Sequence, residues 1–562
     1  MSASSPAIAL QSRWSDRLAW AVLAVLTLIA VLTFRDYGLG WDDYTHAQYG
    51  DLLLSLYSSG FHDTRALSFV NLYLYGGGFD MAAALIAKAL PFDLFETRRL
   101  LGAAVGIAGI GITWRIGRRV GGPLAGLLAL MLLATCPLYY GHMFMNPKDA
   151  PFAVAMALFL LGLVRLLDQY PRPCPTTLFI VGAGFGLSIG SRIMAGFGMI
   201  DAIGALALLF AIEAHADGAR AAGHHLGRLL LTLTPSAILA YAIMALIWPW
   251  SVINPLNPLT AIEVFSHFFE KPWRELFDGM LIEPPDMPRS YVPMLLGLKL
   301  PEIFLLLGAA GLLGTLAAAF RSSISPRLRA IAFAVVLAAI LPIAATIVAR
   351  PAMYNGIRHF VFVLPPVAVA GGLAGAWIVN WIVNWIDNWT VNWTAERAGR
   401  FRQSALVALT AIFAAGVALP AIGMARLHPY EYASFNHIAG GVRGAQSRFM
   451  LDYWGLAFKQ AAQQLRTTLA ARGETPPAGR KWKIAVCGPH PPAQIALGEQ
   501  FEPTWDPNGA DFALMLGVFY CRKLDAPLVA EIARDGVGFA RVYDIRGHTI
   551  SDLFTRPPVK PD

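Results

Sequence analysis

The sequence has few charged residues. Only 14% of its 562 residues are Asp, Glu, Lys or Arg, whereas 56% are hydrophobic. Soluble proteins carry roughly 25% charged residues, so this composition excludes an ordinary soluble enzyme and predicts a polytopic α-helical membrane protein. The formal net charge of +8 does not indicate nucleic-acid binding, because basic residues on the cytoplasmic loops of a membrane protein produce the same excess.

The sequence also has few cysteines, and the four present do not make a disulfide framework, because two of them lie in apolar sequence. Cys136 and Cys174 lie in apolar sequence. Cys487 and Cys521 lie in the more polar C-terminal part and could pair if that part faces an oxidising compartment, which the sequence leaves open. A cleavable signal peptide is not evident, since the first apolar run is long enough to remain as an anchor.

Long apolar runs dominate the first 424 residues. A helix needs about 20 apolar residues to cross a bilayer, and about eleven runs in the chain meet this requirement. They lie near residues 17–35, 97–115, 120–139, 150–167, 175–191, 193–212, 227–249, 301–320, 328–349, 359–383 and 403–424.

The basic residues determine the expected orientation of these spans. Arginines cluster before the first run, between the second and third, and in alternate loops thereafter. With eleven spans, all these clusters lie on one side, which the positive-inside rule makes cytoplasmic together with the N-terminus. We therefore expect a transmembrane domain over residues 1–424, with loops 36–96, 139–150 and 250–300 on the opposite face, and a domain over 425–562 on that same face.

The tail 425–562 has a different character from the rest of the chain. The stretches "KWKIAVCG" (481–488) and "DFALMLGVFY" (511–520) are typical of buried strands. Residues 455–472 and 526–534 are predicted to be helices. The tail is therefore expected to be a small extracytoplasmic α/β domain.

Two adjacent acids open the first outer loop, in "GWDDYTHAQYGDLLLSL" (40–56). One acid suffices to cap the helix that follows, and two ionised acids side by side near apolar surface are costly. A carboxylate here could instead accept a proton from an incoming hydroxyl group or hold a metal ion. Asp42 and Asp43 are therefore candidate catalytic residues, with helix capping as the alternative.

The second outer loop contains a further acid on the same face. In "FMNPKDAPFA" (144–153), Asn146 and Pro147 indicate a turn, and Asp149 lies where the next span begins, so capping again competes with function. Lys148 stands beside it. Acids from two separate loops on one membrane face could together build one carboxylate site.

Three basic residues near the same face are candidates for binding phosphate. Arg358, followed by His359, stands at the outer end of the tenth span, where snorkelling to the headgroups is the alternative. A guanidinium group matches phosphate oxygens in its geometry, and at this depth the phosphate would belong to a lipid. Arg192 and Lys299 are the other two candidates.

These motifs together resemble the GT-C glycosyltransferases, in particular the bacterial relatives of protein O-mannosyltransferases and of the lipid A aminoarabinose transferase. The opening "GWDDYTHAQYGDLLLSL" is similar to the acidic pair and Tyr of that branch, with Asp43 where Glu is usual. Further similar segments follow in the same order, covering roughly residues 15–455: "FMNPKDAPFA", "YVPMLLGLKLPE" (291–302), "YNGIRHFVFVLPP" (354–366), "HPYEYASFNHIAGG" (428–441) and "LDYWG" (451–455).

The resemblance implies an inverting transfer of a monosaccharide from a polyprenyl-phosphate donor to an extracytoplasmic acceptor, which is an envelope glycolipid, a glycan or a protein. It places the chain in the bacterial inner membrane, with the tail domain in the periplasm. By matching position, Asp42 is the base, Asp43 and Asp149 shape the site or hold a metal ion, and Arg358 and Lys299 bind the donor phosphate. The sugar, the acceptor and the length of the polyprenyl chain are not determined.

The sequence leaves the need for a divalent metal ion open. The candidate ligands, if there is one, are Asp43, Asp149, His46 and His142, although solvated or packed histidines are commoner. Tyr430 and Trp454 lie just beyond the last span and could face the acceptor, with packing as the alternative; Lys148 and His359 are weaker candidates for contact with acceptor or sugar.

Two other classes of protein compete with a glycosyltransferase. A transporter or lipid flippase is supported by Asp201, which lies inside the sixth span, but the chain has no clear internal repeat. A sugar-lipid binding protein without catalytic activity is the third hypothesis. Replacing Asp42 separates an enzyme from both.

Overall fold

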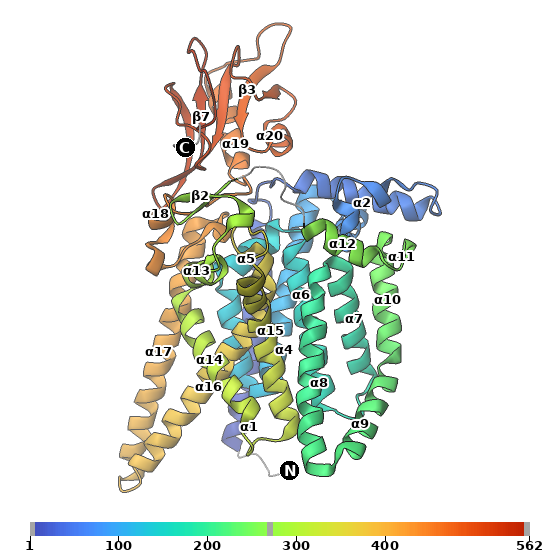
Figure 1. The fold of residues 1–562 in the computed structure, drawn as a ribbon. Coiled ribbons are helices and arrows are strands. Elements are labelled where there is room, and N and C mark those ends of the chain that lie inside the picture. Colours follow the sequence, from blue (N-terminus) through green and yellow to red (C-terminus); the bar gives the residue numbers. More distant parts are fainter. Residues whose placement is uncertain (1–5, 267–273, 556–562) are drawn as a thin grey trace, which may run out of the picture.

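The protein is a bundle of long helices with a small sheet domain at one end (Figure 1). We call the end of the bundle that meets the sheet domain the head. The computed structural model describes residues 6–266 and 274–555. The long helices are α1 (Pro6–Thr33), α4 (Leu94–Ala134), α6 (Asp149–Asp168), α7 (Pro175–Ser191), α8 (Gly196–Asp217), α9 (Ala219–Thr232), α10 (Thr234–Ile247), α14 (Glu302–Phe320), α15 (Pro326–Ala349), α16 (Leu364–Trp389) and α17 (Ala395–Leu427).

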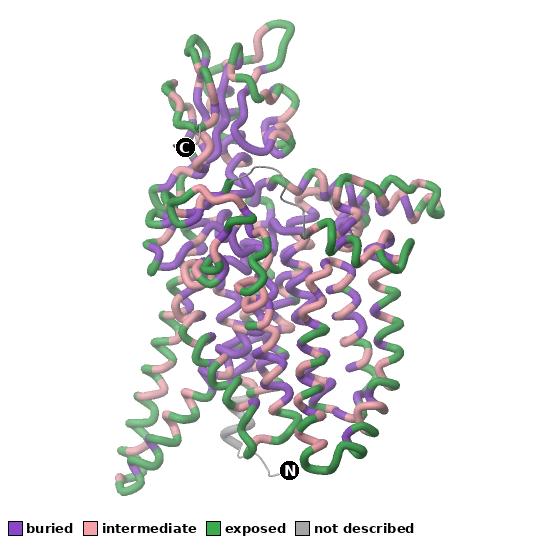
Figure 2. Tube along the Cα trace, in the orientation of Figure 1, coloured by how far each residue is buried: buried purple, intermediate pink, exposed green. Residues whose placement is uncertain are grey.

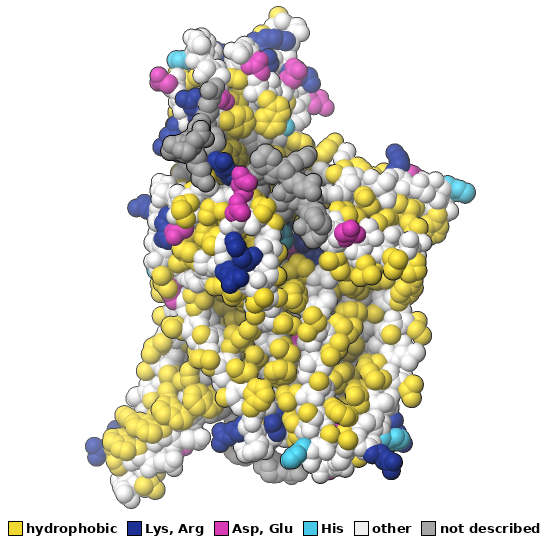
Figure 3. Space-filling model, in the orientation of Figure 1, with side chains coloured by type: hydrophobic (Ala, Val, Ile, Leu, Met, Phe, Trp, Pro, Cys, Tyr) yellow, Lys and Arg dark blue, Asp and Glu magenta, His cyan; other side chains and the backbone are white. Residues whose placement is uncertain are grey.

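The polytopic membrane fold expected from the sequence is confirmed. Within residues 6–266 and 274–555, nine helical segments are long and apolar enough to cross a membrane. They are Arg13–Thr33, Leu94–Ala134, Asp149–Asp168, Ile193–Asp217, Ala219–Ile247, Glu302–Phe320, Pro326–Ala349, Arg358–Trp389 and Ala395–Leu427. Hydrophobic side chains cover the flank of the bundle in Figure 3, and the buried residues concentrate along its interior in Figure 2.

Helix α4 contains a reversal of the chain at Gly122, whose φ of 85° is accessible mainly to glycine. A Cβ placed on Gly126 would lie 2.8 Å from the carbonyl oxygen of Trp114, so the two halves of α4 lie against each other. The expected spans 97–115 and 120–139 correspond to these halves. The total of eleven spans stays a prediction, because it counts α4 twice and includes α7, which has only 17 residues.

The arginine-rich loops meet at the end of the bundle opposite to the head. Arg118 pairs with Asp16 at 2.7 Å, and Arg119 pairs with Asp168 at 2.5 Å. Arg327, at the start of α15, donates to the backbone oxygen of Asp168. Basic side chains that are far apart in the sequence therefore share one end, as the expected orientation requires.

Short elements cover the head, and α2 lies across the bundle (Figure 1). They are α2 (Asp43–Ser58), α3 (Gly78–Ala87), α5 (Pro137–Met145), α11 (Trp250–Ile253), α12 (Asn257–Ser266), β1 (Glu275–Phe277), β2 (Met280–Ile282), α13 (Tyr291–Lys299) and α18 (Gly441–Ala445). Strands β1 and β2 form an antiparallel hairpin inside the loop 250–300, of which residues 267–273 lie outside the described residues.

The C-terminal sheet domain has five strands in the order β4-β3-β5-β7-β6. Strand β3 is parallel to β4 and β5, whereas β7 is antiparallel to β5 and β6. Its elements are α19 (Phe458–Ala471), β3 (Trp482–Cys487), α20 (His490–Leu497), β4 (Phe501–Thr504), β5 (Phe512–Leu516), β6 (Leu528–Arg534) and β7 (Val537–Asp544). The expected small α/β domain is therefore present.

One predicted element of this domain is wrong. Residues 526–534 were expected to form a helix, but Leu528–Arg534 is strand β6. It pairs with β7 through a tight turn in which Asp535 and Gly536 have φ values of 48° and 77°. Asp-Gly is a strong hairpin signal, and the pairing it directs overrides the helix propensity of the Ala and Glu residues in the strand.

The pairing of Cys487 with Cys521, which the sequence left open, is present as a disulfide bond. It joins the end of β3 to the segment that follows β5, 34 residues later. Cys136 and Cys174 are free.

Replacing Cys487 and Cys521 by Ser should destabilise the sheet domain. Closing a loop of this length contributes about 4 kcal/mol in the chain-entropy description of disulfides. We expect the double variant to be cleaved in the sheet domain at lower protease concentration than the wild type, while Cys174→Ser, which removes an exposed free thiol, behaves as wild type. Equal protease resistance of the double variant and the wild type would contradict this expectation.

Candidate functional site

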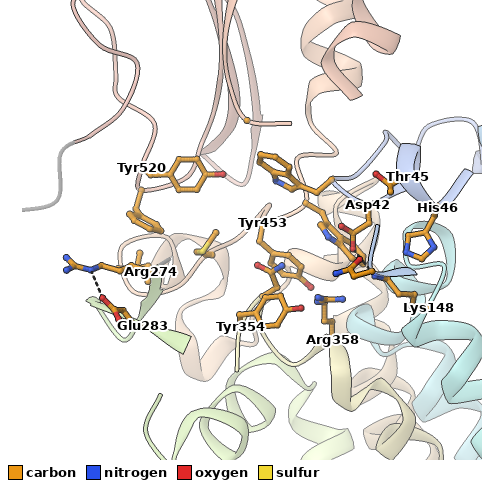
Figure 4. A pocket seen from close by; sticks show the side chains of 18 of the residues that line it. Asp42, Thr45, His46, Lys148, Arg274, Glu283, Tyr354, Arg358, Tyr453 and Tyr520 are labelled. Atoms are coloured by element: carbon orange, nitrogen blue, oxygen red, sulfur yellow. Dashed lines mark ion pairs between the residues drawn. The ribbon is translucent and has the colours of Figure 1, made fainter. Parts of the chain in front are cut away.

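A large cavity lies in the head between the bundle and the sheet domain. It encloses about 1090 Å³. Figure 4 shows Asp42, His46, Lys148 and Arg358 on one side of it, and Tyr520 with the Arg274–Glu283 ion pair on the other. The cavity is therefore charged where the bundle lines it and largely aromatic where the sheet domain lines it.

Asp42 presents an ionised carboxylate to this cavity. Although it stands at the N-cap position of α2, its side chain makes no capping hydrogen bond, and 37% of it is exposed. Lys148 Nζ lies 3.4 Å from Oδ2. Burial raises the pKa of Asp42, but the positive charges of Lys148 and Arg358 outweigh it and lower this pKa to about 2. The capping alternative thus lacks its hydrogen bond, and the carboxylate is available as a proton acceptor.

Asp43 points away from the cavity into the protein, where only 1% of its side chain is exposed. Arg99 Nη1 and Nη2 donate to its two carboxylate oxygens at 3.0 and 2.5 Å, and the Gly40 N–H donates to Oδ2 at 2.7 Å. This bidentate pair fixes the loop that carries Asp42 onto the start of α4. The two adjacent acids therefore have different surroundings, and only Asp42 lines the cavity.

A second buried ion pair joins α2 and α3 to the start of α4. Asp80 accepts a hydrogen bond from Arg98 Nη2 at 2.7 Å, and its other oxygen lies 2.6 Å from His46 Nδ1. The sequence reasoning missed Asp80, Arg98 and Arg99. The available signal was an arginine pair at the start of an apolar run, since buried guanidinium groups require acidic partners.

Asp149 joins two arginines that are far apart in the sequence. Arg358 Nη1 donates to Asp149 Oδ2 at 3.1 Å, and Arg192 Nη2 lies 2.6 Å from Oδ1. Asn146 orients the carboxylate by donating to Oδ2 at 2.8 Å. Asp149 therefore contacts two of the three predicted phosphate-binding residues, Arg192 and Arg358.

This cluster carries one more positive than negative charge. Its cations are Lys148, Arg192 and Arg358, and its anions are Asp42 and Asp149. Among the described residues, Nε of Arg358 has no hydrogen-bond partner. The rings of Tyr354 and Trp454 lie 5.0 and 5.3 Å from the Arg358 guanidinium, and these cation–π contacts help to fix its orientation. A single anionic group in the cavity would balance the charge.

Several predicted residues lie outside the lining of the cavity. Lys299 is buried behind it and donates from Nζ to the backbone oxygens of Tyr432 and Ser434 at 3.1 and 3.2 Å; burial lowers its pKa to about 7. Tyr430 packs against Phe539 of the sheet domain. His359 does not line the cavity, and its ring meets the edge of Tyr354. Trp454, in contrast, does line the cavity, and its ring lies 5.3 Å from the Arg358 guanidinium.

The four candidate metal ligands each have another partner. Asp43 is held by Arg99, Asp149 by two arginines, and His46 by Asp80. His142 lies 3.1 Å from Asn146 Nδ2 and 3.2 Å from the Tyr453 hydroxyl. In the described part of the chain, no group of three or more His, Cys, Asp or Glu side chains could hold a metal ion.

The wall formed by the sheet domain consists mainly of aromatic side chains. Trp505, which is 54% exposed, stacks on His490 with 3.7 Å between ring centroids. Phe519 and Tyr520 immediately precede Cys521, and Gly488 follows Cys487, so the disulfide fixes two segments that line the cavity. Exposed aromatic rings offer flat faces for sugar rings or apolar groups.

Part of the chain is similar to a known protein family. Residues 83–248, under a third of the chain, match a family model described as dolichyl-phosphate-mannose-protein mannosyltransferase. No curated protein sequence is significantly similar to the chain.

Several solved structures are weakly similar to the chain, including the following two. ArnT from Cupriavidus metallidurans in the apo state is 16% identical, with 96% of this chain and 100% of that chain covered and a TM-score of 0.48. The Archaeoglobus fulgidus oligosaccharyltransferase in the apo form is 14% identical, with 88% and 65% covered and a TM-score of 0.45.

The family match coincides with the segment that contributes Arg98, Arg99, Asp149 and Arg192 to the head. The resemblance to protein O-mannosyltransferases that the sequence motifs predict is confirmed over residues 83–248. The chain is a polytopic membrane protein that is similar over residues 83–248 to the dolichyl-phosphate-mannose-protein mannosyltransferase family.

Proposed function

We propose that the protein is an inverting glycosyltransferase that moves a monosaccharide from a polyprenyl-phosphate donor to an acceptor outside the cytoplasm. The observation that carries the proposal is the ionised carboxylate of Asp42 beside Lys148 and Arg358, in a cluster with one surplus positive charge. A sugar joined to a lipid through a phosphodiester carries one negative charge, which balances that surplus. Phosphate leaves readily once cations neutralise it.

The charged residues divide into three roles. Asp42 takes the proton of the acceptor nucleophile, because it is the acid beside the cations with no bidentate partner. Lys148 and Arg358 bind the donor phosphate. Asp149 and Arg192 orient Arg358, and Asp43 holds the loop of Asp42 through Arg99. Lys299 also has a supporting role: it is buried behind the cavity and holds the segment around Tyr432 by donating to the Tyr432 backbone oxygen.

Inversion is supported by the number of carboxylates. Asp42 and Glu283 are the carboxylates that line the described part of the cavity, and Glu283 pairs with Arg274 at 3.7 Å. A retaining reaction through a glycosyl-enzyme intermediate uses a second carboxylate about 5 Å from the first. With Asp42 alone on the phosphate side, a single displacement follows, and the anomeric configuration inverts.

The proposed orientation places the head and the sheet domain in the periplasm and the N-terminus in the cytoplasm of a bacterium. Two observations support it. The disulfide Cys487–Cys521 belongs to an oxidising compartment. The arginines around Asp16 and Asp168 gather at the opposite end, as the positive-inside rule requires of the cytoplasmic face. We divide the chain into a catalytic transmembrane domain, 1–424, and a periplasmic domain, 425–562.

The acceptor belongs to the cell envelope and is a glycolipid, a glycan or a protein. The cavity is large enough for an acceptor group beside the donor headgroup. Its aromatic wall, which includes Trp505 and Tyr520, suits a ring-shaped group such as a sugar.

Asp201 favours a transporter as the second candidate function. It is buried within α8, and its Oδ1 has no hydrogen-bond partner among the described residues. However, the small cavity beside it, of about 20 Å³, is otherwise lined in the described residues by apolar side chains and Gly198. A proton or ion pathway needs a chain of polar groups, so glycosyl transfer has the stronger support.

Replacing Asp42 by Asn should abolish transfer without removing donor binding. A positioned base contributes about 10²–10⁴-fold to rate, and Asn cannot accept the proton. The measurement is mass spectrometry of envelope glycolipids and glycoproteins from a deletion strain complemented with each variant, which looks for the sugar that the wild type restores. Asp51→Asn, an exposed change on the same helix, should restore it fully. Full restoration by the Asp42 variant would rule out its role as the base.

Replacing Arg358 by Ala should weaken binding of undecaprenyl phosphate to the purified protein. A hydrogen bond to a charged group contributes about 1.5–3 kcal/mol, which corresponds to about 10–100-fold in affinity. Titration calorimetry measures the loss, with Arg358→Lys expected to lose less. Arg400→Ala, at an exposed position of α17, serves as the control. Unchanged affinity in the Arg358→Ala variant would disprove the donor site.

A further inference from the structure

The segment that leads into Arg358 has an unusual backbone conformation. Asn355 and Gly356 both have positive φ values, of 55° and 65°. Consecutive left-handed residues are uncommon, and Asn is one of the few residues with a side chain that adopts this conformation with modest strain. Tyr354, Asn355 and Arg358 all line the cavity. The backbone that leads into Arg358 therefore contains a turn of two left-handed residues.

A buried carboxylate, that of Glu275 in β1, binds this turn. The Asn355 N–H donates to Glu275 Oε2 at 2.5 Å, and the Gly356 N–H donates to Oε1 at 3.3 Å. Adjacent backbone N–H groups that point to one side form an anion-binding concavity, which Glu275 fills from within the chain. The Tyr291 hydroxyl also donates to Oε1, at 2.7 Å. Glu275 is 3% exposed and does not line the cavity.

The segment that follows Glu275 holds the same stretch of chain at two further points. The Met353 N–H donates to the backbone oxygen of Pro284 at 3.2 Å. Arg350 Nη2 donates to the backbone oxygen of Met287 at 3.4 Å. Glu275 acts on the turn itself, two residues before Arg358, and the Tyr291 hydroxyl also lies 3.4 Å from the backbone oxygen of Gly356.

Burying a carboxylate is costly, and here the cost has a specific compensation. Burial raises the pKa of Glu275 to about 7, and the three donors that converge on it oppose this rise by stabilising the carboxylate. Arg358, two residues after Gly356, is the first residue of a 3₁₀ helix and donates to Asp149 through Nη1. The guanidinium lies 5.0 Å from the Tyr354 ring, and Tyr354 immediately precedes the turn at Asn355 and Gly356.

We propose that Glu275 is a positioning residue for the donor phosphate: it fixes the turn at Asn355 and Gly356 and thereby aims the Arg358 guanidinium into the cavity. This inference rests on the proposed function, in which Arg358 binds that phosphate. Glu275 itself does not contact the donor. Its effect on donor binding must pass through Arg358, and this requirement makes the proposal testable.

The test is a double-mutant cycle on the full-length, detergent-solubilised protein, with undecaprenyl phosphate as the probe. Glu275→Gln keeps the shape of the side chain but replaces one acceptor oxygen with a donor amide. It should weaken binding of the probe about tenfold, the loss expected for one misplaced charged hydrogen bond. In the Arg358→Ala background the same change should have less than about a twofold effect, because residues that act through one contact are not additive. Asp286→Asn, an exposed change on the same segment, should bind as wild type.

The outcomes separate the two claims. If Arg358→Ala weakens binding and Glu275→Gln does not, or if their effects add, the role of Glu275 is disproved and the proposed donor site stands. If Arg358→Ala binds as tightly as wild type, the donor site fails, and the role of Glu275 fails with it. Should Glu275→Gln not fold, Tyr291→Phe removes one hydrogen bond to the same carboxylate and should weaken binding about two- to threefold; unchanged binding would then disprove the proposal.

Discussion

Each arginine buried at the head of this bundle needs an anion, and this requirement arranges the site. Arg99 pairs with Asp43 and Arg98 pairs with Asp80. Arg192 and Arg358 both pair with Asp149. A buried guanidinium without a partner would cost several kcal/mol, so these pairs draw loops far apart in the sequence to one place. What remains after pairing is the carboxylate of Asp42, beside Lys148 and facing the cavity. The ion pairs thus leave a proton acceptor next to a surplus positive charge.

The sheet domain completes the cavity. Its aromatic residues face the charged wall, and the Cys487–Cys521 disulfide fixes the two segments that carry Gly488 and Tyr520. A buried apolar cluster runs from the bundle through residues such as Tyr432 and Trp454 into the strands. The domain is therefore packed onto the head and forms one wall of the cavity.

Much of this arrangement could be predicted from the sequence, because membrane topology restricts where polar groups can lie. The apolar runs and arginine clusters placed Asp42, Asp149 and Arg358 on one face, and the structure brings these residues together. The separate surroundings of Asp42 and Asp43 could not be predicted, since they depend on Arg99, 56 residues away in the chain. The burial of Lys299 and the role suggested for Glu275 likewise follow from long-range contacts that leave no local pattern.

The central claim is that one phosphate binds between Lys148 and Arg358, beside Asp42. An electron cryo-microscopy structure of the protein with undecaprenyl phosphate tests it most directly. The account predicts phosphate density within hydrogen-bonding distance of the Arg358 guanidinium and the Lys148 ammonium group, with Asp42 facing the acceptor side of the cavity. Phosphate bound elsewhere, with the cluster of Asp42, Lys148 and Arg358 unchanged, would contradict it.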